Sequence, residues 1–392
     1  MLQGENTFFS CVNGKSQSIY WIKRRKQNMN VQRRIALLSV MIVMGAVLGR
    51  AQIPSWESAN PIVPIPDPPL GIGATEKYKT LTEFPDAPTP ERVRLGRWLF
   101  FDKRLSADNT ISCASCHQPK SAFSENTPVS TGIGGQKGNR KAPSFLNQAW
   151  TATPHFFWDG RAASLEEQAG GPMVNPIEMG NENHDVVVQK LSDIRGYAKH
   201  FKEAFGTEEI SIERVTKAIA DYERTRMSGN SPWDKWRKGG DRNAVSQEVK
   251  KGHELFFGNA FCNNCHLGQN FNDGKFHNLG IGWDPEAKKF ADEGRYQVTK
   301  MDADRGAFKT PSLRDVSKHA PYMHDGSIKT LREVVELYIK GGNRNPHLDR
   351  QIDHRFAEQL DLSENEITAL VKFMEALDGE GYQDTEPTAF PQ

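Results

Sequence analysis

Two Cys-x-x-Cys-His runs, at residues 113–117 and 262–266, constrain this chain more than any other feature of its sequence. Both thiols of such a run can add to the vinyl groups of a haem, while the adjacent histidine binds the iron. Four of the five cysteines fall in these runs, and a single zinc site is disfavoured because 149 residues separate His117 from His266. We therefore expect two covalent c-type haems, attached through Cys113, Cys116, Cys262 and Cys265 and bound by His117 and His266.

Residues 1–51 have the features of a leader for export. Arg33 and Arg34 precede an apolar run at 35–48, and small residues follow up to Ala51. This run of 14 residues is short for a membrane span, which favours a cleaved signal peptide over an uncleaved anchor. We expect cleavage after Ala51, with Met29 as the true start. Because haem c is attached outside the bacterial cytoplasm, a periplasmic protein without stable membrane insertion is expected.

The charge and length of the remaining chain limit its partners and its architecture. The 392 residues carry a net charge of +1, and the leader holds eight Lys/Arg and one Glu, which leaves −6 for the rest. This balance argues against nucleic-acid binding and is compatible with a basic redox partner. Cys11 leaves with the leader, so no cysteine remains for a disulfide. The length suffices for two domains.

Helix signals dominate the rest of the sequence, and no period-2 strand pattern stands out. The prolines between 61 and 69 predict an extended arm within 52–88. Helices are expected to begin after Thr89, Ser211, Ser246 and Ser363, the last with Glu366 in a capping box. Breakers at 228–232 and 238–240 place a domain boundary there. We predict a mainly α chain with haem domains at 89–240 and 241–392.

An internal repeat relates these two predicted domains. The Gly-x-x-Leu-Phe-Phe pattern starting at Gly96 recurs from Gly252, and Ala-Pro-Ser at 142–144 answers to Thr-Pro-Ser at 310–312. Asp-Gly at 159–160, followed by a leucine at 165, recurs 166 residues later. We therefore expect two cytochrome c-like haem domains related by an internal repeat.

The same offset pairs Pro172 with Tyr338 in the segment expected to supply the sixth iron ligand. Proline has no side-chain donor, so the first haem should keep an open face. Tyrosine offers a phenolate that holds ferric iron. Tyr338 could also be a core aromatic residue, and the rival ligands at the second haem are Met323, His324 and His319.

From Thr89 to Leu377 the chain resembles the bacterial di-haem cytochrome c peroxidases and the related MauG proteins. The resemblance lies in the first haem motif and in residues 157–162, 167–172, 308–314 and 320–326. It implies that the first haem binds hydrogen peroxide, that the second relays electrons, and that Trp158 lies between them. It also implies that Gln168, Pro172 and Glu178 line the peroxide pocket, where Glu178 moves a proton between the peroxide oxygens and Gln168 donates or accepts a hydrogen bond.

Departures from the peroxidases point toward the MauG branch. Ile133 stands where peroxidases carry a histidine that caps the first haem, and Tyr338 stands where they carry a methionine. The resemblance also implies a calcium ion held by an asparagine and the carbonyls of His319 and Pro321. Lys141 occupies the asparagine position, so an ammonium could replace calcium, although Asn139 nearby keeps calcium possible.

These residues favour an enzyme that uses hydrogen peroxide over a non-catalytic di-haem electron carrier. Electrons would come from a small cytochrome c or cupredoxin. The alternative is MauG proper, which oxidises tryptophan residues of a partner protein to complete a quinone cofactor. Trp233 and Trp236 are expected at the surface, as candidates for an outward electron relay.

Overall fold

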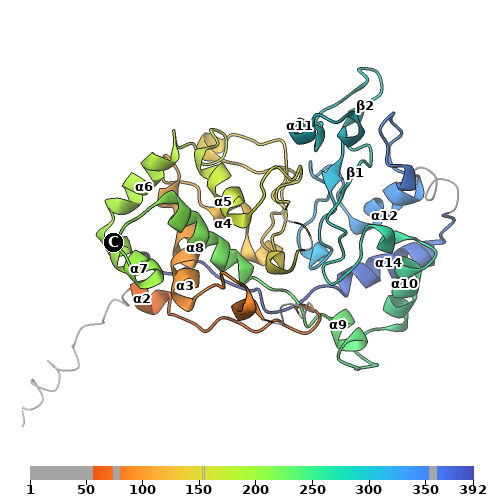
Figure 1. Ribbon diagram of the computed structural model, residues 1–392. Coiled ribbons are helices and arrows are strands. Elements are labelled where there is room, and N and C mark those ends of the chain that lie inside the picture. Colours follow the sequence, from red (N-terminus) through yellow and green to blue (C-terminus); the bar gives the residue numbers. More distant parts are fainter. Residues whose placement is uncertain (1–55, 74–79, 152, 154, 353–359) are drawn as a thin grey trace, which may run out of the picture. The chain divides into compact units, whose positions relative to one another are not determined.

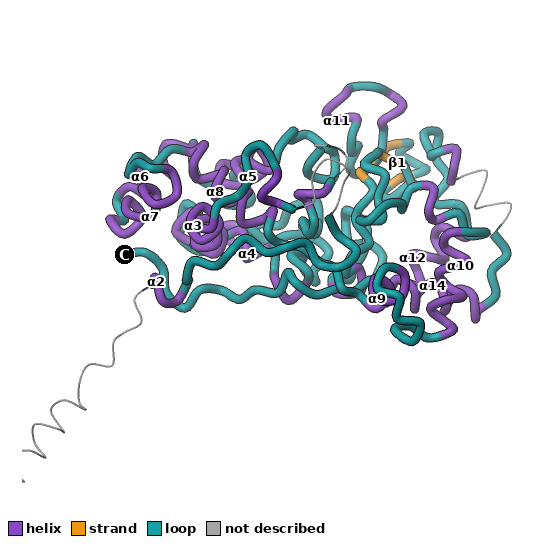
Figure 2. The backbone as a smooth tube through the Cα atoms, turned by 60° about the horizontal axis from the view of Figure 1, so that its bottom comes forward, coloured by secondary structure: helices purple, strands orange, loops and turns teal. Residues whose placement is uncertain are grey.

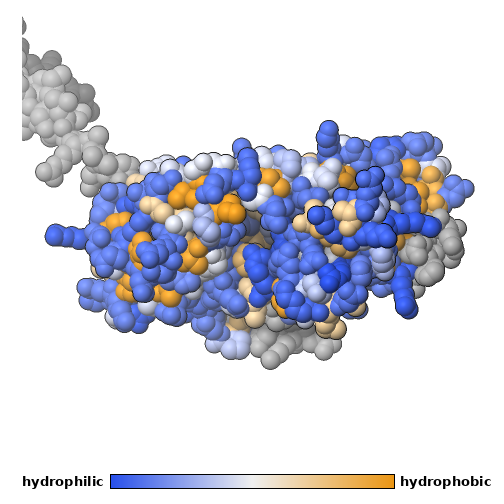
Figure 3. All heavy atoms as spheres, turned by 90° about the horizontal axis from the view of Figure 1, so that it is seen from above, coloured by the Kyte–Doolittle hydropathy of each residue, from blue (hydrophilic) through white to orange (hydrophobic). Residues whose placement is uncertain are grey.

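The computed structural model describes residues 56–73, 80–151, 153, 155–352 and 360–392. The predicted leader, its cleavage after Ala51 and the start at Met29 lie outside these residues. Among the described residues, no helix combines the length and the apolar character that a membrane span requires. On the face drawn in Figure 3, hydrophobic side chains form small groups among hydrophilic ones, and the surface is hollowed near the middle of the view.

Helices and loops make up nearly all of the described chain, which confirms the prediction of a mainly α protein (Figure 2). The strands in this part are two short antiparallel pairs that the sequence pattern did not predict. Strand β1 (Phe276–His277) pairs with β4 (Phe308–Lys309), and β2 (Trp283–Asp284) pairs with β3 (Lys289–Phe290). Short helices α2 (Trp56–Ala59), α4 (Cys113–Cys116) and α11 (Tyr296–Thr299) lie between the longer elements.

The first group of helices surrounds the first Cys-x-x-Cys-His run (Figure 1). It comprises α3 (Pro90–Phe101), α5 (Leu165–Val174), α6 (His184–Ser192), α7 (Arg195–Phe205) and α8 (Ile212–Arg224). The predicted caps are confirmed, because Thr89 accepts a hydrogen bond from the Arg92 amide and Ser211 from that of Arg214. Helix α3 crosses α8 at Gly96, where a Cβ atom would lie 1.8 Å from the Ala218 carbonyl oxygen.

The second group surrounds the second run and is built in the same way (Figure 1). It comprises α9 (Pro232–Arg237), α10 (Gln247–Phe257), α12 (Leu331–Ile339) and α14 (Glu364–Glu375). Ser246 caps α10, and Ser363 forms the predicted capping box with Glu366. Helix α10 crosses α14 at Gly252, where a Cβ atom would lie 2.0 Å from the Ala369 carbonyl oxygen.

Backbone features recur between the two groups at the offset of 166 residues. The isolated bridge between Phe156 and Ala162 has its counterpart between Tyr322 and Ile328. The residues after the first partner of each bridge, Phe157 and Met323, both have a positive φ, at 63° and 72°. Ser164 caps α5 and Thr330 caps α12. The helices that follow these bridges therefore begin at matched positions.

Both ends of the described chain cross from one helix group to the other. Near the start, Leu70 donates its backbone N–H to Asn230 Oδ1 at 3.1 Å, just before α9. At the other end, Asp384 accepts hydrogen bonds from Arg97 at 2.8 Å, and Trp98 donates to the Ala389 carbonyl at 3.2 Å. The last segment, which follows α14, thus packs on α3 of the first group.

Candidate haem-binding active site

The first motif presents its histidine in a fixed orientation. A capping box at Ser112 starts the single turn of α4, which carries Cys113 and Cys116. The Nδ1 atom of His117 lies 2.9 Å from the Phe123 carbonyl oxygen. Because a carbonyl only accepts, Nδ1 carries the hydrogen and Nε2 is left as a metal ligand.

The second motif has the same arrangement with different local helix geometry. Residues Cys262–Asn264 form a 3₁₀ turn, and His266 Nδ1 lies 2.8 Å from the Phe271 carbonyl oxygen. Phe271 has a φ of 52°, and its counterpart Phe123 has a φ of 55°. This left-handed backbone turns each carbonyl back toward its histidine, so both imidazoles have the tautomer that suits iron ligation.

One continuous cavity is lined by both motifs and fits two haems chemically. The Cys113, Cys116, Cys262 and Cys265 side chains all line it and form no disulfides. Burial raises the pKa of the Cys116 thiol to about 11 and that of Cys262 to about 12. Neutral thiols disfavour a zinc site, which requires thiolates. Every predicted site residue lines the same cavity, namely Trp158, Gln168, Pro172, Glu178 and Tyr338 together with both motifs.

The pocket beside the first motif is built from α5 and the loop after it. Gln168 and Pro172 lie on α5, and Glu178 follows it. Glu178 Oε1 accepts a hydrogen bond from Asn175 Nδ2 at 2.9 Å. Burial raises the pKa of Glu178, and the nearby positive charge of Arg161 partly opposes this. The carboxyl group is thus prepared to exchange a proton closer to neutral pH than an ordinary glutamate.

A second cavity reaches the same pocket from a polar side. It shares Phe157, Arg161, Pro172, Asn175 and Glu178 with the cavity that both motifs line. Its other walls carry ionisable side chains, among them Arg92, Glu166, His184 and Lys217. This arrangement gives small polar molecules a route to Glu178 that is independent of the space between the two motifs.

The glycine-rich loop that contains Ile133 packs directly on this pocket. Ile133 donates its backbone N–H to the Glu178 carbonyl at 2.9 Å. A Cβ atom on Gly132 would lie 1.9 Å from the Ile177 carbonyl oxygen, so only glycine allows this approach. Among the described residues, Ile133 is outside the cavity lining, whereas Gly132 is part of it. The loop therefore brings its backbone, and no ligating side chain, to the pocket.

Tyr338 occupies in α12 the position that Pro172 occupies in α5. Each is the eighth residue after its N-cap, Thr330 and Ser164 respectively. Burial raises the pKa of the Tyr338 phenol, and the nearby Cys265 and Cys262 contribute to the same direction. A buried phenolate at this position would consequently require a metal cation beside it.

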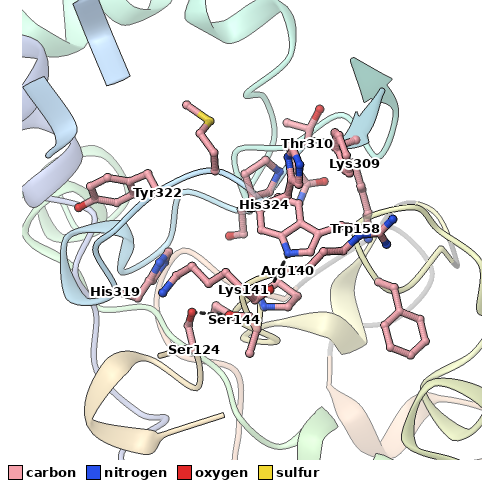
Figure 4. Close-up of a pocket in the computed structure, with 18 of the residues that line it drawn as sticks. Ser124, Arg140, Lys141, Ser144, Trp158, Lys309, Thr310, His319, Tyr322 and His324 are labelled. Carbon is pink, nitrogen blue, oxygen red and sulfur yellow. Dashed lines mark hydrogen bonds between the residues drawn. The ribbon is translucent and has the colours of Figure 1, made fainter. Parts of the chain in front are cut away.

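Trp158 connects the residues around the first motif with those around the second (Figure 4). Its indole Nε1 donates to the Lys141 carbonyl oxygen at 2.8 Å, and its own carbonyl accepts from the Lys309 amide at 2.8 Å. The indole ring lies 6.5 Å from the ring of His324, centroid to centroid. These contacts fix a half-buried indole in the cavity that both motifs line.

The rival ligands Met323, His324 and His319 also line the cavity. The ring of His324 stacks on Phe308 with centroids 3.5 Å apart, and burial lowers its pKa to about 4. His319 lies beside Lys141 (Figure 4), and its Nε2 is buried without a hydrogen-bond partner. The ring of His324 is therefore stacked on Phe308, whereas His319 keeps a buried Nε2 atom without a hydrogen-bond partner.

Lys141 occupies the position where the family resemblance implies the calcium-binding asparagine. Its side chain is 3% exposed, and its ammonium donates to the backbone carbonyls of Glu125 and Thr127. Asn139 instead donates to Asp292 at 3.3 Å. Burial lowers the pKa of Lys141 to about 8. A cationic donor within a group of carbonyls does not fit a second cation at the same place.

Some residues of the site went unrecognised in the sequence. Glu223 lines the cavity with 4% exposure, its Oε2 has no hydrogen-bond partner, and burial raises its pKa to about 8. Its place four residues after the core residue Ile219 is the signal that could have revealed it. The carbonyls of Phe123 and Phe271 carry no sequence signal, because any residue has a carbonyl.

Comparisons with known proteins agree with this geometry. A family model described as di-haem cytochrome c peroxidase matches residues 90–242. Methylamine utilization protein MauG of Methylorubrum extorquens is 42% identical over 74% of this chain and 79% of its own. Cytochrome c551 peroxidase of Nitrosomonas europaea is 36% identical over 75% of this chain and 83% of its own.

A solved structure extends the likeness to nearly the whole fold. The crystal structure of a MauG-like protein associated with microbial copper homeostasis is 30% identical, with a TM-score of 0.69. It covers 87% of this chain and 99% of its own. From the two haem-binding runs in one cavity and these relatives, we conclude that the chain belongs to the di-haem cytochrome c peroxidase and MauG family and is a di-haem peroxidase-type oxidoreductase.

Proposed function

We propose that this protein works in the periplasm, reduces hydrogen peroxide at the haem of the first motif, and draws electrons from a small cytochrome c or cupredoxin. When bound, the haem held by His117 would supply an iron open to peroxide, and the haem held by His266 and Tyr338 a second redox centre. Glu178, Gln168, Pro172 and Trp158 would serve the reaction around these groups.

The proposal rests on the difference between two matched helices. Helices α5 and α12 both follow a bridged turn and a hydroxyl N-cap, and the eighth residue after each cap lines the cavity. In α5 this residue is Pro172, which has no donor atom, and in α12 it is Tyr338, which has one. The match supports an open first haem and a tyrosine-ligated second haem within an internal repeat of two domains, 89–240 and 241–392.

Glu178 is the residue suited to proton transfer. Its pKa is raised by burial, so the carboxylate can take the proton from one peroxide oxygen and return it to the other at the pH of the periplasm. Asn175 fixes the carboxyl group, and Gln168 offers an amide in the same cavity for a hydrogen bond to peroxide. The polar second cavity supports a route for peroxide and protons to Glu178.

Trp158 is the residue suited to carry electrons between the two motifs. Its indole is anchored to the Lys141 carbonyl, and its backbone is bound to Lys309. This double attachment supports a fixed distance from both histidine ligands, which electron transfer through a side chain requires. Pro172 contributes by leaving the peroxide face free of a competing ligand.

The substitution Glu178→Gln tests the catalytic role. In the protein loaded with both haems, kcat/KM for peroxide reduction should fall by about 10²–10⁴, because proton transfer is lost while the shape is retained. Glu182→Gln, at an exposed position of the same segment, is the matched control and should keep wild-type kinetics. Equal kinetics for both variants would refute the assignment of Glu178.

A second candidate function is the oxidation of a tryptophan side chain in a partner protein. The 42% identity to a methylamine utilization protein MauG and the position of Tyr338 favour it. The two functions differ in product: a cytochrome donor is reoxidised one electron at a time, whereas a protein substrate gains oxygen on a tryptophan. Mass spectrometry of candidate partners after peroxide treatment distinguishes them.

We further propose that Lys141 replaces the calcium ion that the family resemblance implies. Its buried ammonium already donates to the carbonyls of Glu125 and Thr127. Elemental analysis of the purified protein should find no calcium at one ion per chain. Lys141→Asn should introduce calcium binding, and stoichiometric calcium in the wild type would contradict the replacement.

A further inference from the structure

Two tryptophans, a histidine and a phenylalanine form a continuous row of rings on the side of the second motif where His266 is held. Phe271, whose carbonyl binds His266 Nδ1, contacts Trp233 with ring centroids 5.1 Å apart. The ring of Trp233 lies 6.2 Å from that of His253, and His253 lies 5.1 Å from Trp236. Trp233 is 7% exposed, and Trp236 reaches the surface as a half-buried side chain. Both Trp233 and Trp236 were expected at the surface from the sequence, and only Trp236 lies there.

The buried tryptophan has a proton acceptor. Trp233 Nε1 lies 3.3 Å from His253 Nδ1. An indole N–H only donates, so Nδ1 of the histidine must be the unprotonated nitrogen. Burial, with a contribution from Arg237, lowers the pKa of His253 to about 4, which keeps the imidazole neutral near pH 7. The pair is thus a hydrogen-bonded donor and acceptor, and because the lowered pKa makes His253 a weak base, the proton moves only once oxidation has made the indole N–H strongly acidic.

The charges around the two indoles differ. Arg314 lies over Trp233 at 5.7 Å, but its charge is compensated by Asp234, and both side chains are fully buried. Trp236 carries Arg237 at 5.3 Å and Lys250 at 6.0 Å over its ring. Two cations at this ring disfavour a positive charge resting on Trp236. An oxidised state is consequently better accommodated at Trp233, where the proton can leave to His253.

The first helix group also holds a tryptophan–histidine pair, because Trp56 Nε1 donates to His200 Nε2 at 3.1 Å and the Trp98 ring lies 4.5 Å from that of His200. The helix position that carries the histidine differs, however. The residue after the helix-crossing glycine is His253 in α10 but Arg97 in α3. Arg97 is engaged by Asp384 through hydrogen bonds of 2.8 and 3.0 Å. What distinguishes the second group is that its row begins at Phe271, the residue whose carbonyl binds His266, and continues through Trp233 and His253 to Trp236.

We propose that Trp233, with His253 as its proton acceptor, is a redox relay between the second haem and the surface, and that electrons enter the relay at Trp236. The inference rests on the proposed function, because peroxide supplies the oxidising equivalents. Trp233 gives one electron toward the second haem and its Nε1 proton to His253, which leaves a neutral indolyl radical and an imidazolium. One electron from an external donor, which tunnels through the Trp236 ring without oxidising it, and return of the proton restore both side chains.

The relay is tested by trapping the radical. Protein loaded with both haems and made with ring-deuterated tryptophan is mixed with hydrogen peroxide, without a donor, and freeze-quenched for electron paramagnetic resonance. An indolyl signal that narrows on deuteration is expected, and Trp233→Phe should abolish it. Trp150→Phe is the matched control, because Trp150 is 6% exposed and donates to the sulfur of Met227, which is not a base.

Two more variants separate the relay from a packing role. His253→Gln retains a hydrogen-bond acceptor without basicity and should also remove the neutral radical. Trp236→Phe should keep the radical and slow its reduction by ferrous mitochondrial cytochrome c, whereas Trp283→Phe at the β2–β3 hairpin should not. Haem absorbance and circular dichroism report whether each variant folds.

The outcomes distinguish the two proposals. Peroxide consumption with an indolyl signal that survives Trp233→Phe overturns the relay and leaves the peroxidase function intact. Unchanged reduction kinetics in Trp236→Phe overturn the assignment of that residue. Loaded wild-type protein that consumes no peroxide overturns the proposed function and the relay together.

Discussion

At the scale of single residues, the two haem sites differ chiefly at one matched helix position. Pro172 and Tyr338 share the eighth place after their N-caps, and both line the cavity. The sequence sufficed to pair them, because Asp-Gly and the leucine that follows it recur at one offset of 166 residues just before both positions. It could not show which neighbours they meet, since His319 and His324 reach the same cavity from a different segment.

Tyr338→Phe removes the oxygen donor while keeping the ring. The second haem should then lose its low-spin signature, as seen in its absorbance and paramagnetic resonance spectra, while the first haem is unaffected. Tyr322→Phe, another cavity-lining tyrosine, is the control and should leave both spectra unchanged. If Tyr338→Phe had wild-type spectra, another residue would be the ligand.

Glu223 should make stability depend on pH. Its pKa is raised from 4.5 to about 8 by burial, so the folded protein keeps a proton that the unfolded chain releases within this range. The free energy of unfolding should therefore fall as the pH rises from about 4.5 to 8, by on the order of 5 kcal/mol at most. Denaturant melts at pH 5 and 8.5 measure this difference.

Glu223→Gln should remove most of that fall, because a neutral amide cannot ionise. Glu213→Gln, on the exposed side of the same helix, serves as the control and should retain it. If the free energy of unfolding depended on pH in the same way in wild type and Glu223→Gln, ionisation of Glu223 would not be the cause of the fall.

At the scale of elements, the sequence predicted the starts of helices from local capping residues, but it did not predict the pairing of strands that lie far apart in the chain. The caps at Thr89, Ser211, Ser246 and Ser363 were predictable, because each satisfies amides within its own first turn. The pairing of β1 with β4 was not, since two-residue strands have no period and their paired residues lie 33 and 31 positions apart in the chain. In the sequence, Gly96 and Gly252 stood out only because each begins a copy of the repeated pattern. Their place at a helix crossing was not predictable.

Gly252→Ala should destabilise the protein. The new Cβ would lie 2.0 Å from the Ala369 carbonyl oxygen and 2.8 Å from Phe373 Cβ, so α10 and α14 must separate. A loss of about 1–3 kcal/mol in the free energy of unfolding is expected from this overpacking. Gly138→Ala is the control, since its nearest atom would lie 3.8 Å away. Equal denaturation midpoints for the two variants would contradict a tight crossing.

At the scale of the whole molecule, the sequence predicted which residues belong to the site but not that they line one cavity. Both motifs and Trp158 line one cavity although 149 residues separate the two histidines. The end of the chain, predicted as part of the second domain, packs on α3 through Asp384 and Ala389. Such contacts depend on the folded path of the chain and leave no periodic signal.

An open first haem beside a tyrosine-ligated second haem is the feature on which the proposed reaction depends most. Electron paramagnetic resonance of the resting ferric protein, loaded with both haems, tests it directly. One high-spin, five-coordinate haem and one low-spin haem without a methionine-to-iron charge-transfer band are predicted. Two low-spin haems in the resting protein would contradict the account, because a protein side chain would then occupy the site assigned to peroxide.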